Sequence, residues 1–376
     1  MPSSVPLLIP DLPPLDQLVP YLQRIDANHW YSNFGPLVQE LESRLAQSFL
    51  PRDARPSIAV TVSNATAGIE MALRALNLPP AAPVLVPAMT FVATATAVLS
   101  AGLSPIVGDI DPDSWLLTPA LALQAVRKRK LMAVVPVATF GVAQDAAGWD
   151  DFYKQTGLPV VIDAAAAYGN QVDPGPTCAV YSLHATKPLA SGEGGVVVTR
   201  SPELARDIRQ LSNFGINLTD PKASLIGTTT MIGTNAKLSE YHAAVGLASL
   251  DAWATNSTRR RDLYRAYTDA IKAVDGPALS WQQSPAETVR SLCCFLLPTR
   301  ELRDHYERQL AKAQIATRRW YLPTINRHPA FKHLTHFATP VADNIARRLL
   351  GVPFYPALSD DQRGAVLAAL QVAATG

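Results

Sequence analysis

The sequence predicts an α/β protein with a large, mixed but mostly parallel sheet and a smaller C-terminal α/β domain. Three observations support this fold class. Between residues 58 and 200, short apolar runs alternate with helical patterns, as they do where helices cover both faces of a sheet. The length of 376 residues allows one large and one small domain. Hydrophobic residues make up 48% and charged residues 17%, which is typical of a globular chain.

Each apolar run predicts one buried strand. The runs cover residues 58–62, 84–87, 105–110, 133–137, 160–163, 179–183 and 195–199. Ligands of such sheets bind beyond the carboxyl ends of the strands, so the polar residues just after each run are the functional candidates. A helix is predicted over 201–211, capped by Ser201.

The chain is expected to have three parts. These are an N-terminal arm and first helix (1–35), a large domain that holds the apolar runs (36–250) and a small C-terminal domain (251–376). The opening segment is rich in proline up to Pro20, which predicts an extended arm. The stretch 213–234 is rich in Gly, Thr and Asn and predicts a loop that is mobile or contacts a partner.

The composition argues against several classes of partner. A net charge of +2 is too near balance for a dedicated nucleic-acid surface. Cys178, Cys293 and Cys294 fit neither a disulfide framework nor a metal site, and are expected to be buried, reduced thiols. The N-terminus does not resemble a signal peptide, and prolines and threonines interrupt the apolar region 84–107. We therefore expect a cytoplasmic protein without a metal, membrane or nucleic-acid partner.

Two strand ends carry groups that can bind a cofactor. Residues 63–68, Ser-Asn-Ala-Thr-Ala-Gly, join a strand to a helix whose free amides can bind an anion such as phosphate. An ordinary helix cap by Ser63 or Asn64 explains the same residues. Asp163 ends another apolar strand, and a buried carboxylate needs a partner. A helix N-terminus, an arginine or the protonated ring nitrogen of a cofactor would each serve.

Lys187 follows the run 179–183 in a loop that also holds Ser182 and His184. A desolvated lysine has a lowered pKa and reacts as a nucleophile with carbonyls. An anion cradle, a strand-end aspartate and such a lysine together fit pyridoxal 5'-phosphate. This cofactor needs an anion site for its phosphate, a carboxylate for its ring nitrogen and an amine for its aldehyde.

Several segments resemble motifs of the sugar aminotransferase family often called DegT/DnrJ/EryC1/StrS, of the aspartate-aminotransferase-like class (PLP fold type I). They include Asn33-Phe-Gly-Pro36, Ser182-Leu-His-Ala-Thr-Lys187, Gly192-Glu-Gly-Gly195 and Gly233-Thr-Asn235, and the resemblance covers nearly the whole chain. It implies these cofactor contacts: Ala65, Thr66 and Ser182 at the phosphate, Phe91 over the ring face, Asp163 at the ring nitrogen, Lys187 bonded at the aldehyde, and Asn235 reaching the phosphate of the neighbouring subunit. It therefore implies a homodimer with shared active sites.

The chain departs from the family pattern at four positions. Ala166 stands where the family commonly has a His or Gln that contacts the ring hydroxyl of the cofactor. Ala65 replaces a glycine, Lys237 a frequent arginine and Ala138 a frequent histidine. The cofactor assignment survives these changes, whereas the family's detailed substrate contacts cannot be transferred.

Substrate contacts are expected from Trp30, Tyr31, Asn33, His184, Arg319 and Tyr321. Trp30, Tyr31 and Asn33 either line a sugar pocket or anchor the arm. Arg318, Arg319 and Tyr321 either meet a nucleotide diphosphate, or the arginines are ordinary surface groups. His184 contacts the cofactor or substrate, or is a structural histidine.

The resemblance implies transamination from an amino acid, glutamate in most of the family, to a keto sugar linked to a nucleotide. Lys187 would be both covalent anchor and general base. The runner-up is a PLP-dependent sugar dehydratase or deoxygenating enzyme on the same scaffold, which typically has histidine at the lysine position. Asp163 and Lys187 argue against a non-catalytic regulatory protein, and the lack of a Gly-x-Gly-x-x-Gly turn argues against a nicotinamide-dependent dehydrogenase.

Overall fold

The computed structural model describes residues 4–50, 55–218 and 227–375. In chain order its strands are β1 Ile58–Val62, β2 Pro83–Pro87, β3 Ser104–Gly108, β4 Ala133–Val134, β5 Val161–Asp163, β6 Cys178–Ser182, β7 Gly195–Thr199, β8 Cys293–Leu296 and β9 Leu349–Val352. Its helices are α1 Leu15–Asn28, α2 Pro36–Gln47, α3 Ala65–Ala75, α4 Val92–Ser100, α5 Pro119–Lys128, α6 Ala146–Thr156, α7 Pro202–Ser212, α9 Glu240–Asp251, α10 Trp253–Lys272, α11 Arg300–Lys312, α12 Pro340–Arg348 and α13 Asp360–Thr375. All seven predicted strands are present, within a few residues of the expected ends.

The first seven strands lie in the order β3-β2-β4-β5-β6-β7-β1. Hydrogen bonds join β3, β2 and β4 in parallel and β5 and β6 in parallel, and single parallel bridges join the β4 side to the β5 side. Only β7 runs against its two neighbours, β1 and β6. A continuous apolar run is compatible with either direction, so the run itself could not show this. The pairing of the β4 side with the β5 side is limited to single bridges at Val134 and Val137, because Pro136 between them has no N–H to donate.

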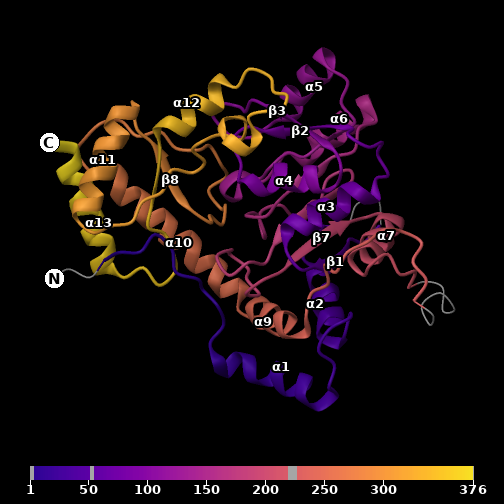
Figure 1. Ribbon diagram of the computed structural model, residues 1–376. Helices are drawn as coiled ribbons and strands as arrows, with labels where there is room; N and C mark the ends of the chain where they lie inside the picture. Colours follow the sequence, from indigo (N-terminus) through magenta and orange to yellow (C-terminus); the bar gives the residue numbers. More distant parts are fainter. Residues whose placement is uncertain (1–3, 51–54, 219–226, 376) are drawn as a thin grey trace.

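Consecutive residues of each strand face opposite cores. Val84 and Val86 pack in one core, with α3, α4 and α7, while Leu85 packs in the other, with α2, α5, α6 and α9. A third core lies between β8, β9 and the helices α10, α11 and α13. Figure 1 shows this third core and its elements on the left, next to both chain termini, and the large sheet on the right.

The N-terminal arm differs from its prediction. It is extended only before α1, where Val5 pairs with Ile315. The helix α1 begins at Leu15 and contains Pro20, which the sequence interpretation placed in the extended arm. Pro20 lies on the exposed side of α1, while Ile25 on the opposite side is buried. Burial of this apolar side therefore outweighs the helix-breaking tendency of one proline.

Two buried carboxylates fix the helices that flank the sheet. Glu240 accepts hydrogen bonds from the amides of Leu37 and Val38, both at 2.8 Å, and so caps α2, whose own N-cap residue is Gly35. Glu42 accepts hydrogen bonds from the amide and hydroxyl of Thr61 at 2.8 and 2.9 Å.

The predicted loop 213–234 lies partly outside the described residues, and its described parts form only isolated bridges.

Candidate active site

Asp163 ends β5 as a buried carboxylate, with 5% of its surface exposed. The hydroxyl of Thr94 donates to its Oδ2 at 2.7 Å, and the amide of Ala165 donates to its Oδ1 at 3.1 Å. Burial raises the pKa of Asp163, while these two hydrogen bonds and the charge of Lys187 act in the opposite direction. The carboxylate can therefore stabilise a cation placed beside it.

Lys187 is held in a tight turn that follows β6. Its amide donates to the carbonyl of His184 at 2.9 Å, and the amide of Ala185 donates to the carbonyl of Gly192 at 2.8 Å. Burial lowers the pKa of the Lys187 amine, and the charge of Asp163 partly offsets this effect. A larger fraction of the amine is thus unprotonated at neutral pH than in a solvated lysine, which makes it a nucleophile and a base.

The N-terminus of α3 is the segment for which the sequence predicts an anion site. Asn64 caps the helix by accepting from Ala67, and its carbonyl accepts from Gly68. Within the described part of the chain, the amides of Ala65 and Thr66 donate to no acceptor. They remain available for a phosphate.

Ser182 reaches the same cradle through the sheet register. It lies opposite Gly195 in the β6–β7 pair, and Gly195 in turn lies opposite Val62, just before the α3 turn. A Cβ at Gly195 would come within 2.7 Å of the Ala65 nitrogen, so the glycine allows the strand to approach the helix end. The phosphate residues expected from the sequence are therefore neighbours, as are Asp163 and Lys187.

Three aromatic rings form a wall of the site. Phe91 is the N-cap residue of α4 and is 51% exposed. The ring of Tyr321 lies 6.2 Å from Phe91 and 5.6 Å from Phe140, centroid to centroid. Burial raises the pKa of Tyr321, and the charge of Asp163 adds to this effect. Tyr321 therefore belongs to the same region as Phe91 and Asp163.

Sequence reasoning missed Thr94 and Phe140. A threonine among the small apolar residues of α4 was a weak signal for Thr94, whose hydroxyl is fully buried against Asp163. Phe140 carried no signal, because its contact with Tyr321 joins distant parts of the chain.

The other predicted substrate residues lie elsewhere. The carbonyl of Tyr31 accepts from the amide of Glu240 at the start of α9, and the Tyr31 ring stacks on Tyr241 at 6.2 Å. Trp30 is about half exposed nearby, and Asn33 adopts a positive φ in the same connection between α1 and α2. No contact among the described residues joins these three side chains to Lys187 or Asp163.

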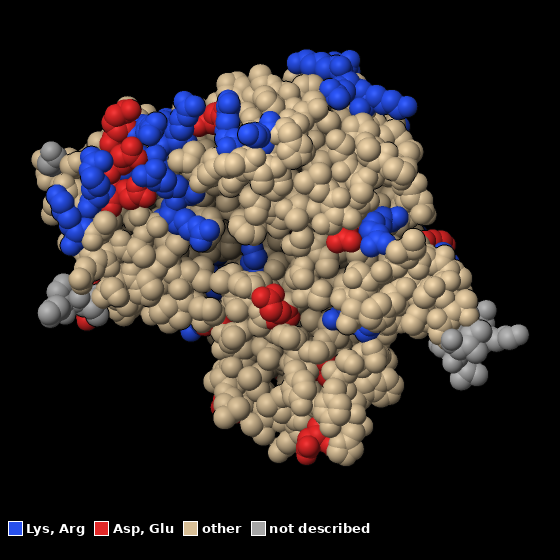
Figure 2. Space-filling model, in the orientation of Figure 1, with Lys and Arg blue, Asp and Glu red and all other residues tan. Residues whose placement is uncertain are grey.

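Arg319 is neutralised by carboxylates of α11. Its Nε donates to both carboxylate oxygens of Glu307 at 3.0 Å, and its guanidinium also pairs with Asp304. Figure 2 shows charged side chains crowded over this part of the molecule, and a hollow near the centre of the same face. An arginine that is already paired within its own chain is a weaker candidate for a diphosphate than the sequence suggested.

His184 and Asn235 each have local partners. The Nδ1 atom of His184 lies 2.8 Å from the hydroxyl of Thr186, and its Nε2 lies 3.6 Å from a carboxylate oxygen of Glu193. The side-chain oxygen of Asn235 accepts from Lys237 at 2.8 Å. The next residue, Ala236, accepts a hydrogen bond from the amide of Ser63, which places this segment beside the end of β1.

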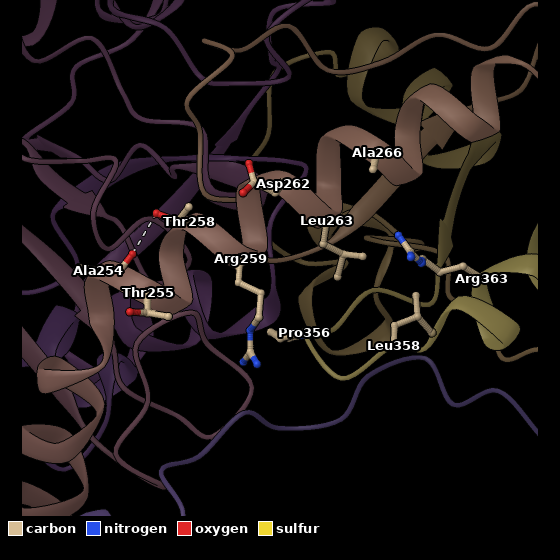
Figure 3. A pocket seen from close by; sticks show the side chains of 10 residues that line it. All are labelled: Ala254, Thr255, Thr258, Arg259, Asp262, Leu263, Ala266, Pro356, Leu358 and Arg363. Carbon is tan, nitrogen blue, oxygen red and sulfur yellow. Dashed lines mark hydrogen bonds between the residues drawn. The ribbon is translucent and has the colours of Figure 1, made fainter.

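A separate cavity of about 900 Å³ lies between α10 and the segment that precedes α13. It contains none of the predicted site residues. Figure 3 shows Arg259 and Arg363 among its side chains, and both are paired with carboxylates, those of Asp11 and Asp360. We therefore place the candidate site at the strand ends and not in this cavity.

Three further observations concern metal sites, membrane spans and the cysteines. Over the described ranges there is no group of three or more His, Cys, Asp or Glu side chains that could hold a metal ion. No helix in the part of the chain that the structure describes is both long and apolar enough to cross a bilayer. The three cysteines are free and buried, as expected from the sequence.

Comparison with known proteins finds matches over almost the full length. The model of the DegT/DnrJ/EryC1/StrS aminotransferase family matches residues 16–371. The chain is 32% identical to the erythromycin biosynthesis sensory transduction protein EryC1 of Saccharopolyspora erythraea, over 97% of this chain and 100% of that protein. It is 30% identical to a dTDP-4-amino-4,6-dideoxy-D-glucose transaminase of Shigella dysenteriae, over 94% of each chain. The crystal structure of DesI with its TDP-sugar product aligns with a TM-score of 0.86 and 31% identity, over 100% of this chain and 94% of that one. These matches confirm the predicted fold class.

Proposed function

The chain belongs to the DegT/DnrJ/EryC1/StrS aminotransferase family, and from this premise we propose its reaction. It is a PLP-dependent transaminase that moves an amino group from an amino acid, with glutamate as the donor, to a keto sugar linked to a nucleotide. The electrostatic coupling of a buried Asp163 with Lys187, at strand ends near the free amides of the α3 N-terminus, is the observation that carries this proposal. The similarity to a dTDP-sugar transaminase and to DesI with its TDP-sugar product supports the substrate class.

The residues present fit pyridoxal 5'-phosphate. The amides of Ala65 and Thr66, for which the described parts of the chain offer no acceptor, together with the hydroxyl of Ser182 would hold the phosphate. The Asp163 carboxylate would meet the ring nitrogen, because it is buried and no side-chain cation among the described residues is in hydrogen-bond contact with it. Phe91 would cover the ring face, and Lys187 would bond to the aldehyde. When bound, the cofactor supplies an electron-poor ring that weakens the C–H bond at the carbon bearing the amino group.

The protein side chains then have separate tasks. Lys187, with its lowered pKa, would accept the proton from that carbon and return it to the former aldehyde carbon, on the other side of the nitrogen. An ionised Asp163 beside the ring would favour a protonated ring nitrogen. Phe91 and Tyr321 would shield one side of the site from water once the cofactor covers the exposed face of Phe91.

Three finer statements are part of the proposal. A second copy of the chain completes the site with Asn235, and the exposed apolar side chains Phe214 and Ile232 near this segment support such an interface. The protein works in the cytoplasm, which the free buried cysteines support. The division into residues 1–35, 36–250 and 251–376 stays a prediction, supported by the separate core around β8 and β9.

The decisive experiment reduces the purified protein with borohydride and locates the fixed cofactor by peptide mass. We expect the label on Lys187, and loss of both label and amino transfer in Lys187→Ala. Lys154→Ala, on the exposed face of α6, is the matched control and should retain both. Amino transfer is followed with ¹⁵N-glutamate and a panel of nucleotide keto sugars. A Lys187→Ala protein that is still labelled and still turns over would overturn the proposal.

A further inference from the structure

Asp163 receives its only side-chain hydrogen bond, within the described residues, from Thr94 on α4. Thr94 is fully buried, and its hydroxyl lies 2.7 Å from Asp163 Oδ2. The nearby position at which the family commonly has a His or Gln is Ala166, whose methyl group cannot donate a hydrogen bond. The environment of the Asp163 carboxylate is therefore set from a different element of the fold.

The hydrogen bonds around Thr94 have a direction. A threonine hydroxyl has one proton, and Thr94 gives it to Asp163 when that carboxylate is ionised. The contact of 2.9 Å between the hydroxyls of Thr90 and Thr94 must then be donated by Thr90. Thr90 is 2% exposed, so water does not compete for this bond. The two threonines form a short chain that ends on the carboxylate.

Thr94 also connects two of the proposed cofactor contacts. Its amide donates to the carbonyl of Phe91 at 3.3 Å in the first turn of α4. The same residue thus binds the backbone of the proposed ring-face aromatic and the carboxylate proposed for the ring nitrogen. A shift of Asp163 relative to Phe91 would break one of these two bonds.

We propose that Thr94, oriented by Thr90, is a positioning residue that holds the Asp163 carboxylate in register with Phe91 for contact with the ring nitrogen of the cofactor. The inference rests on the proposed function. It assigns no proton transfer to Thr94, whose effect is transmitted through Asp163.

The test compares two ligands of the full-length apoprotein. One is pyridoxal 5'-phosphate and the other is its carbocyclic analogue, in which a C–H group replaces the ring nitrogen. Both carry the aldehyde and the phosphate, so only the contact with Asp163 differs. Thr94→Val keeps the side-chain shape and removes the hydroxyl. It should weaken binding of pyridoxal 5'-phosphate by about tenfold or more, the range of one hydrogen bond to a charged group, and leave binding of the analogue unchanged.

Three variants complete the design. Thr94→Ser restores the hydroxyl and should recover the affinity for pyridoxal 5'-phosphate. Thr90→Val should cause a smaller loss, because the bond from Thr94 to Asp163 remains. Thr268→Val removes a buried hydroxyl of α10 that bonds only a backbone carbonyl, and should alter neither affinity.

The outcomes separate this inference from the proposed function. An equal loss for both ligands in Thr94→Val would overturn the inference, because it would indicate a purely structural role. An unchanged affinity for pyridoxal 5'-phosphate in that variant would overturn it as well. A wild-type protein that does not bind pyridoxal 5'-phosphate at all would instead refute the proposed function, and the inference with it.

Discussion

Gly195 lies where the sheet and the proposed phosphate cradle approach most closely, and Gly195→Ala is the sharpest perturbation of that contact. The Cβ that alanine adds would lie 2.6 Å from the carbonyl carbon of Asn64 and 2.7 Å from the nitrogen of Ala65. Both are backbone atoms of the α3 turn, which cannot rotate away as a flexible side chain would. The substitution must therefore displace either β7 or the start of α3.

The magnitude follows from two opposing effects. Alanine in a strand interior is favoured over glycine by about 0.5–1 kcal/mol, through the lower entropy of the unfolded chain. Forcing a methyl group into a packed site costs about 1–3 kcal/mol, and contacts this short lie at the upper end. We expect Gly195→Ala to lower the free energy of unfolding by about 2 kcal/mol. A displaced α3 turn would also misalign the amides of Ala65 and Thr66.

The assay measures unfolding of the apoprotein in urea and its affinity for pyridoxal 5'-phosphate and for pyridoxal, which lacks the phosphate. Gly195→Ala should unfold at lower urea and lose much of the preference for the phosphorylated ligand. Gly364→Ala is the control, because nothing lies within 4 Å of a Cβ at this position in α13. That variant should gain about 0.5–1 kcal/mol and keep the preference. If Gly195→Ala unfolds like the wild type and keeps its preference, the geometric argument for the cradle is wrong.

Two further predictions concern the charges around the sheet. The charge of Asp163 raises the pKa of Lys187, so Asp163→Asn should lower that pKa further. The measurement is the pH profile for labelling of Lys187 by a small, ringless aldehyde, and its midpoint should move to lower pH. A midpoint that rose would contradict the coupling. Glu240→Gln replaces a fully buried carboxylate that accepts hydrogen bonds from the amides of Leu37 and Val38. It should lower the free energy of unfolding, measured in urea, by about 2 kcal/mol. Glu70→Gln, which removes a partly exposed pair with Arg74 within α3, serves as its control and should change stability little.

The sequence predicted most of the sheet because each strand is a short apolar run between turn residues. It did not reveal the direction of β7, since strands buried on both faces have the same pattern in either orientation. It also placed Pro20 in an extended arm, because local composition does not report the burial of Ile25 on the opposite side of α1.

For the site, the sequence singles out a residue where the chemistry requires one residue type, and carries no signal where a contact depends on distant segments. Asp163 and Lys187 fall into the first class, and the structure couples their charges. Thr94 bonds Asp163 from 69 positions away in the chain, so no local pattern predicts that contact. The sequence also gives no sign that Arg319 is paired with Glu307, a contact that depends on the packing of α11.

Tyr321 makes one side of the candidate site depend on the C-terminal part of the chain. Its ring packs against Phe91 and Phe140, which both belong to loops of the large sheet. Phe140 is in turn held by Trp115 in an edge-to-face contact at 6.2 Å, and neighbouring Gly141 accepts a hydrogen bond from Asn170 at 2.7 Å. The same Asn170 side chain donates to and accepts from the backbone of Val289, at 2.9 Å in both directions. A substitution that breaks the contact between Asn170 and Val289 would therefore shift Phe140 and, with it, the aromatic wall. The α3 cradle would stay in place, because the wall and the cradle are attached to different strands.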